Sequence, residues 1–207
     1  MVAARGGHEE CVRVLLDDNA DIETTDNEGW TVLHYAAISG NVAVVNHVLD
    51  QKDLLCSRRS RRGHSPLDVA LRSGKADAAR SLLHRDASVI HQSDSEGFTP
   101  LHLATESGLT SIVEELISLG ADLNQASNDG QTPLHTAIRL CNCKTRQVEM
   151  TTDLDQIQER GDTLPPSEAL IQFLISQGSK NGTKDNDGYF PAQYAKDEHI
   201  KQIALQR

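Results

Sequence analysis

A four-residue motif recurs along the chain and decides its fold. It reads Thr31-Val-Leu-His34, Ser65-Pro-Leu-Asp68, Thr99-Pro-Leu-His102 and Thr132-Pro-Leu-His135, and it returns in degenerate form as Phe190-Pro-Ala-Gln193. A glycine stands two residues before each copy, at Gly29, Gly63, Gly97, Gly130 and Gly188. The intervals between these glycines are 34, 34, 33 and 58 residues, and the last contains one repeat plus 25 extra residues. A fixed period of this length indicates a repeat architecture.

Each position of the motif has a physical reason. Thr or Ser accepts hydrogen bonds from unpaired amides at the start of a helix, and Pro suits the first helical turn. Leu and the following small residues face the core, and Gly40, Gly74 and Gly108 are expected to end the first helix of their repeats. The second helices carry an apolar stripe, as in Val44, Val45, Val48 and Leu49. Helices this short need neighbours for stability, so the repeats are predicted to stack.

The motif and its spacing resemble the ankyrin-repeat family, whose repeats of about 33 residues carry a Thr-Pro-Leu-His-x-Ala core. The resemblance implies an all-α solenoid of helix-turn-helix units joined by projecting β-hairpin-like loops. We expect a single domain over residues 1–207, with repeats at about 1–28, 29–62, 63–96, 97–129, 130–187 and 188–207. By the same resemblance, His34, His102 and His135 hydrogen-bond within and between repeats, and Asp68 alters that network in the third repeat.

The two ends and one insertion depart from the pattern. The chain opens inside a first helix, which fits either an abbreviated natural cap or a piece of a longer protein. The last repeat lacks the Thr cap and its second helix is polar, so we expect it to be the C-terminal cap. The extra residues lie near 141–166, where a short helix from Thr152 to about Gly161 is predicted. This insertion is interpreted either as a solvated loop or as a partner-specific contact.

Composition excludes several classes of function. The net charge of −10 opposes nucleic acid and anionic membranes as partners, and no window of 18 apolar residues could span a bilayer. The four cysteines show no disulfide spacing, so an intracellular location, cytoplasmic rather than nuclear, is expected. Cys141-Asn-Cys143 lacks a second ligand pair for zinc. No phosphate loop, nucleophile elbow or carboxylate pair stands out, so we expect no enzyme activity, no metal and no cofactor.

The family resemblance places a partner on a concave face made of hairpin tips and first helices. The residue after each anchor glycine is Trp30, His64, Phe98, Gln131 or Tyr189. Three of these are aromatic, and they are interpreted either as a row of partner anchors or as residues packed against their own hairpins. The ends of the first helices add Ile38, Arg72, Glu106, Arg139 and Leu140 to the candidate site.

One basic run, Ser57 to Arg62, is predicted at a hairpin tip beside Arg72. Arg61, Arg62 and Arg72 would form a basic centre that suits a partner with an acidic segment. The alternatives are a solvated tip, a nuclear import signal, or phosphorylation at Ser60. Asn124 is a further candidate for modification, because the family's asparaginyl hydroxylase prefers the spacing that Leu116 and Asp122 provide.

These observations predict a monomeric, non-enzymatic scaffold that binds a partner protein or an extended peptide. The rival interpretation is a structural spacer or targeting segment of a larger multidomain protein, such as a receptor, channel or kinase.

Overall fold

The structure is a computed structural model that describes residues 1–143, 147–154 and 165–205. The chain divides into two compact units, Met1–Ser95 and Glu96–Arg207. The division falls beside a predicted repeat boundary, and the single domain stays a prediction. Within the described ranges every regular element is a helix, so the all-α prediction is confirmed.

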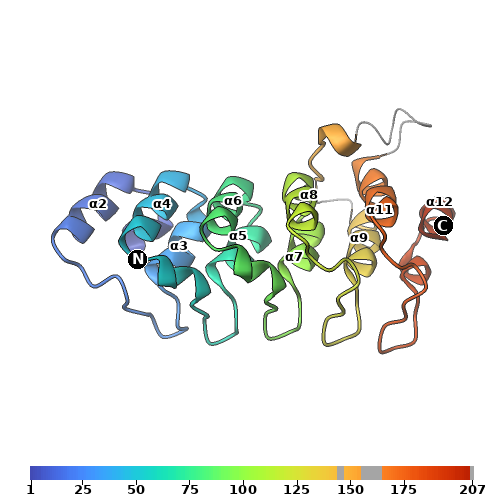
Figure 1. Cartoon of the computed structure of the whole chain (residues 1–207), viewed down its shortest axis with the longest axis horizontal. Coiled ribbons are helices and arrows are strands. Elements are labelled where there is room, and N and C mark those ends of the chain that lie inside the picture. Colours follow the sequence, from blue (N-terminus) through green and yellow to red (C-terminus); the bar gives the residue numbers. More distant parts are fainter. Residues whose placement is uncertain (144–146, 155–164, 206–207) are drawn as a thin grey trace. The chain divides into compact units, whose positions relative to one another are not determined.

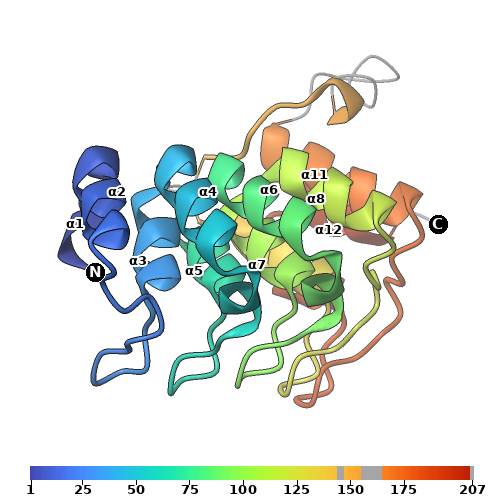
Figure 2. The same ribbon diagram turned by 60° about the vertical axis from the view of Figure 1, so that its left-hand side comes forward.

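Unit 1 contains three helix pairs. They are α1 (Val2–Arg5) with α2 (Glu9–Asp17), α3 (Val32–Ser39) with α4 (Val42–Gln51), and α5 (Pro66–Arg72) with α6 (Ala76–Arg85). The 3₁₀-helices η1 (Asp53–Ser57) and η2 (Ala87–His91) follow α4 and α6. Helix α3 contacts α1 and α5, while α4 contacts α2 and α6, so first and second helices form separate layers (Figure 1, Figure 2).

Unit 2 also contains helix pairs, but in its last pair a short 3₁₀-helix takes the place of the first α-helix. Its elements are α7 (Pro100–Ser107), α8 (Thr110–Ser118), α9 (Pro133–Cys141), α11 (Pro166–Ser176), η3 (Pro191–Tyr194) and α12 (Glu198–Leu205). Helix α9 packs between α7 and η3, and α11 packs against both α9 and α12. In the last repeat, Phe190 stands where the others have a capping hydroxyl, and only the short η3 forms. The sequence predicted a polar second helix in this repeat. Helix α12 instead buries Ile200 and Ile203, so it is amphipathic.

The helix termini lie where the motif predicts them, except that α5 ends at Arg72 with Ser73 as its C-cap, one residue before the predicted Gly74. Thr31, Ser65, Thr99 and Thr132 are the N-caps of α3, α5, α7 and α9. Gly40 and Gly108 end α3 and α7 in the left-handed conformation, which lacks the steric penalty that a side chain would bring. The motif leucines Leu33 and Leu67 in unit 1, and Leu101 and Leu134 in unit 2, are almost completely buried. Within each unit, each of these repeats therefore contributes its own leucine to the core.

The motif histidines join successive repeats within each unit. The Nδ1 atom of His34 accepts a hydrogen bond from the Thr31 amide at 3.1 Å. Its Nε2 atom then carries the proton and donates to the His64 carbonyl at 3.0 Å. His102 and His135 form the same contacts, to the carbonyls of Gln131 and Tyr189. The expected hydrogen bonding within and between repeats is confirmed for these three residues.

The described part of the insertion packs on the preceding repeat. The Glu149 amide donates to the Gly108 carbonyl at 2.9 Å, and the Ser111 hydroxyl donates to the Glu149 carboxylate at 2.9 Å. The Thr151 hydroxyl donates to Glu114, and Leu154 is fully buried. The described insertion therefore packs on the fold through Glu149, Thr151 and Leu154, while Gln147, Met150, Thr152 and Asp153 are exposed, and both interpretations of the insertion stay predictions. Residues 152–154 are helical as expected, while the rest of the predicted helix lies outside the described residues.

Candidate functional site

The loops between repeats are built as hairpins by a recurring set of hydrogen bonds. In the first loop the Asp26 amide donates to the Trp30 carbonyl, and the Glu28 and Trp30 amides donate to the Asp26 carboxylate. Gly29 supplies the left-handed turn with a φ of 77°. The Arg61 amide then donates to the Glu28 carbonyl at 2.8 Å, which joins the first hairpin to the second. The same amide-to-carbonyl bond recurs from Ser60 to His64, from Ser127 to Gln131 and from Asp185 to Tyr189, and it fixes the residue after the anchor glycine in these loops.

The aromatic residues at this register pack against their own repeats. Trp30 lies with its ring centroid 5.6 Å from His34 and 5.3 Å from Tyr35. Phe98 forms an edge contact with His102, and Tyr189 forms one with Tyr194. Trp30 and Phe98 are half-buried, whereas Tyr189 is 49% exposed. Local packing is thus present at all three aromatic positions, and each ring keeps part of its surface accessible.

One concavity in unit 1 gathers several predicted residues. It has a volume of about 390 Å³ and is lined by Arg5, Asp26, Glu28, Trp30, Tyr35, Ile38, Arg62 and His64. We call it the hairpin pocket. Trp30, Ile38, Arg62 and His64 were predicted to bind a partner, and the fold brings these four side chains together.

The sequence interpretation missed Arg5 and Tyr35 as lining residues, although the repeat register contains a signal for each. Arg5 precedes Gly7 by two residues, as Ile38 precedes Gly40 and Arg72 precedes Gly74. Tyr35 follows the first motif, where the later copies have Val69, Leu103 and Thr136.

The charged side chains of the hairpin pocket differ in whether they have hydrogen-bond partners. The Tyr35 hydroxyl donates to the Asp26 carboxylate at 2.6 Å. This hydrogen bond, together with the two amides, lowers the pKa of Asp26 and raises the pKa of Tyr35. In contrast, the side chains of Arg5 and Arg62 make no ion pair or hydrogen bond with any described residue. Asp26 is therefore committed to its own hairpin, while the two guanidinium groups are available.

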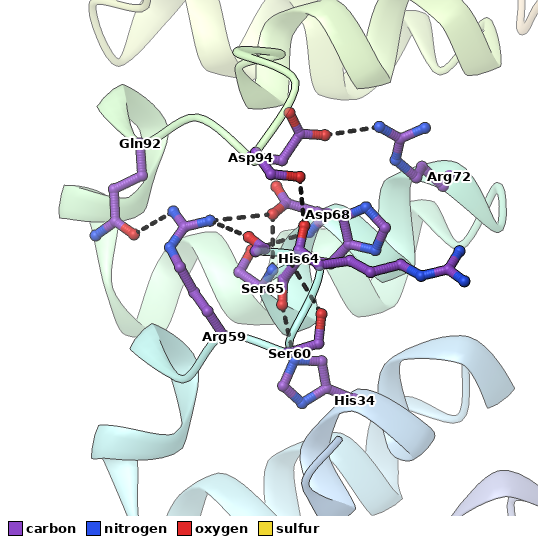
Figure 3. Close-up of polar contacts among 12 residues, drawn as sticks. His34, Arg59, Ser60, His64, Ser65, Asp68, Arg72, Gln92 and Asp94 are labelled. Atoms are coloured by element: carbon purple, nitrogen blue, oxygen red, sulfur yellow. Dashed lines mark hydrogen bonds and ion pairs between the residues drawn. The ribbon is translucent and has the colours of Figure 1, made fainter. Parts of the chain in front are cut away.

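The predicted basic centre is divided by the fold (Figure 3). Arg72 donates to the Asp94 carboxylate at 2.7 Å, and the Asp94 side chain is fully buried. Arg59 turns inward, donating to the Gly63 carbonyl and to the Gln92 side chain, and lies 3.7 Å from the buried Asp68 carboxylate. Arg61 and Arg62 remain exposed. Arg72 of the predicted basic centre is therefore paired with a buried carboxylate, and binding of an acidic segment by this centre stays a prediction.

Burial of Asp68 explains why an arginine is drawn inward. The Ser65 amide donates to the Asp68 carboxylate at 2.7 Å, so Asp68 completes the capping box where other repeats have histidine. Burial raises the pKa of Asp68, while Ser65 and Arg59 act in the opposite direction. The solvated-tip interpretation of the run from Ser57 to Arg62 consequently fails for Arg59.

Two other predicted residues are placed where they cannot act as expected. Leu140 is only 4% exposed, because it belongs to the buried face of α9, and it is not presented to a partner. Ser60 is 6% exposed and its hydroxyl accepts a hydrogen bond from the His64 amide, so a kinase could not reach it in the folded hairpin. Its predicted modification would require the hairpin to open.

The remaining candidates lie in unit 2. The Arg139 guanidinium donates to the Gln131 side chain at 2.7 Å, and Glu106 is half-buried. The Asn124 side-chain oxygen accepts from the Lys180 amide at 2.7 Å, which joins two successive loops. Its hydroxylation stays a prediction.

Other kinds of site have little support in the described ranges. No three His, Cys, Asp or Glu side chains of the described residues come together as metal ligands. Burial raises the pKa of the Cys141 thiol to about 11, which disfavours the reactive thiolate. None of the described helices combines the length and apolarity needed to cross a bilayer.

Comparisons with known proteins agree on the architecture. A family model described as ankyrin repeats, in three copies, matches residues 1–93 and 88–148. Human Rabankyrin-5 is 31% identical over 140 residues, covering 67% of this chain and 12% of that protein. Palmitoyltransferase AKR1 of Lachancea kluyveri is 36% identical over 134 residues, covering 62% of this chain and 18% of its own length.

A third relative aligns along almost the whole chain. The transient receptor potential cation channel subfamily A member 1 homolog of Caenorhabditis elegans is 26% identical over 203 residues, covering 98% of this chain and 14% of that protein. The chain therefore spans less than a fifth of the length of each of these three relatives.

Proposed function

Because the chain belongs to the ankyrin-repeat family, whose repeats generally mediate protein–protein interaction, we propose that it is a non-enzymatic scaffold that binds a partner protein. Binding uses the surface formed by hairpin loops and first helices, which the family architecture makes concave. The observation that carries this proposal is the hairpin pocket, where aromatic, apolar and unpaired cationic side chains converge on one surface. Half-buried aromatic side chains beside available arginines are typical of protein-binding hot spots.

Enzyme activity has no candidate site in the described residues, although one relative is by name a palmitoyltransferase. A repeat array can occur in one protein with an enzyme, so the proposal concerns this chain alone. We further propose that the chain acts as a monomer. We also propose that it acts inside the cell, on the ground that its four cysteines lack disulfide spacing.

A spacer or targeting segment is the second candidate, and one observation favours it. The relatives are much longer proteins, of which this chain covers 12%, 18% and 14%. A spacer would need the stacked helices for rigidity but would not need any particular surface residue. The two functions therefore differ in their sensitivity to surface substitution.

The test compares two charge-matched variants in affinity capture from cell lysate. The surface variant carries Ile38→Lys and Arg139→Glu, which lie at the ends of first helices in units 1 and 2. The control carries Asn46→Lys in α4 and Lys201→Glu in α12, with the same net change of charge. We expect the surface variant to lose proteins that both the wild type and the control capture, with all three unfolding at the same urea concentration.

Equal capture by all three proteins would contradict the binding function and favour the spacer. A lower unfolding midpoint in the surface variant would assign Ile38 and Arg139 a structural role instead, and would also contradict the proposal.

A further inference from the structure

The hairpin pocket has more free hydrogen-bond donors than acceptors. Arg5 lies at the end of α1 and Arg62 in the second hairpin, and each brings an unpaired guanidinium group to the same concavity. The indole N–H of Trp30 makes no hydrogen bond with a described residue either. Both arginines are exposed, so a ligand that supplies acceptors can take the place of solvent at these donors.

The acidic side chains of the pocket do not use up its free hydrogen-bond donors. The Asp26 carboxylate accepts from Tyr35, Glu28 and Trp30, so its oxygens are occupied by its own hairpin. Glu28 is the other acidic lining residue, and it is exposed. Two guanidinium groups with planar, fork-shaped donors face a single uncommitted carboxylate. Asp26 and Glu28 balance the formal charge of the two guanidinium groups, so the pocket favours an anionic group through its unpaired donors and not through its net charge.

The rest of the pocket wall is apolar and aromatic. Trp30, Tyr35 and Ile38 are all half-buried, so each keeps accessible surface toward the concavity. The volume of about 390 Å³ lies within the range of small-ligand pockets and is enough for one or two side chains. Its shape and chemistry therefore suit an apolar side chain with charged neighbours.

Resting on the proposed binding function, we infer that the hairpin pocket binds a partner segment in which an aliphatic side chain is flanked by carboxylates. The aliphatic side chain packs on Trp30 and Ile38, and the carboxylates pair with Arg5 and Arg62. Bidentate arginine–carboxylate pairs are among the stronger charge-assisted hydrogen bonds, and they fix the orientation of the bound segment. The chain as a whole is acidic, with a net charge of −10, so local pairing with Arg5 and Arg62 has to outweigh a general repulsion of such a segment.

The chain provides its own reporter for this interaction. Trp30 is the single tryptophan in the sequence, so all tryptophan emission comes from the wall of the hairpin pocket. The probe is the capped pentapeptide acetyl-Glu-Glu-Leu-Glu-Glu-amide, titrated into the whole chain at low salt. The two comparison peptides replace every Glu with Gln or with Lys and keep the central Leu.

We expect a saturable change in Trp30 emission with the Glu peptide that weakens as salt is added. The Gln and Lys peptides should bind at least about tenfold more weakly, because they lack the carboxylates. The double variant Arg5→Gln with Arg62→Gln should weaken the Glu peptide by a similar factor. Arg13→Gln with Arg80→Gln is the matched double control, because these two arginines lie on the second helices α2 and α6 and do not line the pocket, and its binding should equal that of the wild type.

Three results would overturn the inference. They are equal binding of the Glu and Gln peptides, unchanged binding in the double variant, and no saturable signal with the Glu peptide at millimolar concentration. If the Glu peptide fails while Ile38→Lys with Arg139→Glu still abolishes partner capture, only the ligand class of this pocket is wrong. If capture is the same in every variant, the binding function itself fails.

Discussion

The second and third repeats of unit 1 solve one capping problem with different chemistry. Helix α3 begins with Thr31 and His34, and its neutral imidazole reaches forward to the His64 carbonyl. Helix α5 begins with Ser65 and Asp68, and its buried carboxylate draws Arg59 in from the preceding turn. Both arrangements satisfy the N-cap amide, at 3.1 Å and 2.7 Å respectively.

The difference shows how one substitution redirects its neighbours. A buried carboxylate is unfavourable unless it is paired and hydrogen-bonded. Arg59 supplies the opposite charge, and its guanidinium also donates to the Gly63 carbonyl and to Gln92. One arginine of the basic run therefore becomes part of the fold, whereas Arg62 remains available at the hairpin pocket.

The largest effect is expected for His34→Ala in the repeat with the neutral cap. The change leaves the Thr31 amide and the His64 carbonyl without their partner and creates a buried cavity, so the free energy of unfolding should fall by about 2–4 kcal/mol. Urea unfolding followed by circular dichroism measures it. His91→Ala, at an exposed position of η2, is the control and should change stability by less than about 0.5 kcal/mol. A similar loss in both variants would remove the special role of the motif histidine.

Arg59→Ala tests the ion pair in the third repeat. It leaves the buried Asp68 carboxylate unpaired and should cost about 1–3 kcal/mol of unfolding free energy, allowing for the partial exposure of Arg59. Arg58→Ala should cost less than about 0.5 kcal/mol, since Arg58 is exposed and lies 3.9 Å from Glu23. In a double-mutant cycle, Asp68→Asn should reduce the cost of Arg59→Ala. Additive costs would show that the two side chains do not interact.

A third experiment compares two glycines that follow first helices. Gly74 and Gly108 have φ values of 67° and 69°, so alanine strains the backbone at both, by about 1 kcal/mol. A side chain at Gly108 would also lie 2.8 Å from the Gln147 carbonyl oxygen, whereas nothing lies within 4 Å at Gly74. Gly108→Ala should therefore cost more than Gly74→Ala. It should also speed hydrogen exchange of the Glu149 amide, and equal costs would contradict packing of the insertion on this turn.

The two caps should respond to pH with opposite signs. Burial lowers the pKa of His34 from 6.5, so the unfolded chain binds more protons below that pH and stability falls as pH falls. Burial raises the pKa of Asp68 from 3.8, so the folded chain holds its proton longer and stability falls as pH rises through that raised value. The stability gained by Asp68→Asn over the wild type should therefore increase between pH 4 and 7, as measured by urea unfolding midpoints. A constant difference would show that the Asp68 pKa is the same in both states.

The smallest effect on stability is expected for Arg62→Gln. The Arg62 side chain pairs with no described residue, so unfolding free energy should change by less than about 0.5 kcal/mol. Arg62 and Arg59 should therefore differ in their effect on stability, although they lie three positions apart in one basic run. A loss close to that of Arg59→Ala would assign Arg62 to the fold and remove it from the proposed site.

Much of the fold was predictable because the motif acts locally. The caps at Thr31, Ser65, Thr99 and Thr132 depend on residues three positions apart, and local spacing is visible in a sequence. The candidate site was only partly predictable. The register identified Trp30, Ile38 and Arg62, but it also included Leu140, because exposure on a short helix depends on the angle at which neighbouring helices pack.

The sequence by itself determined the repeat period and the starts of the first helices, because each follows from contacts within one repeat or from its register with the next. The histidine links were implied by the resemblance to the ankyrin-repeat family. Only the tertiary structure decided which arginines are free. Arg59, Arg62 and Arg72 look alike in the sequence, but Asp68 and Asp94 take two of them and leave the third exposed. The physical reason is that a carboxylate buried by folding needs a counter-charge, and the nearest arginine is known only once the chain has folded.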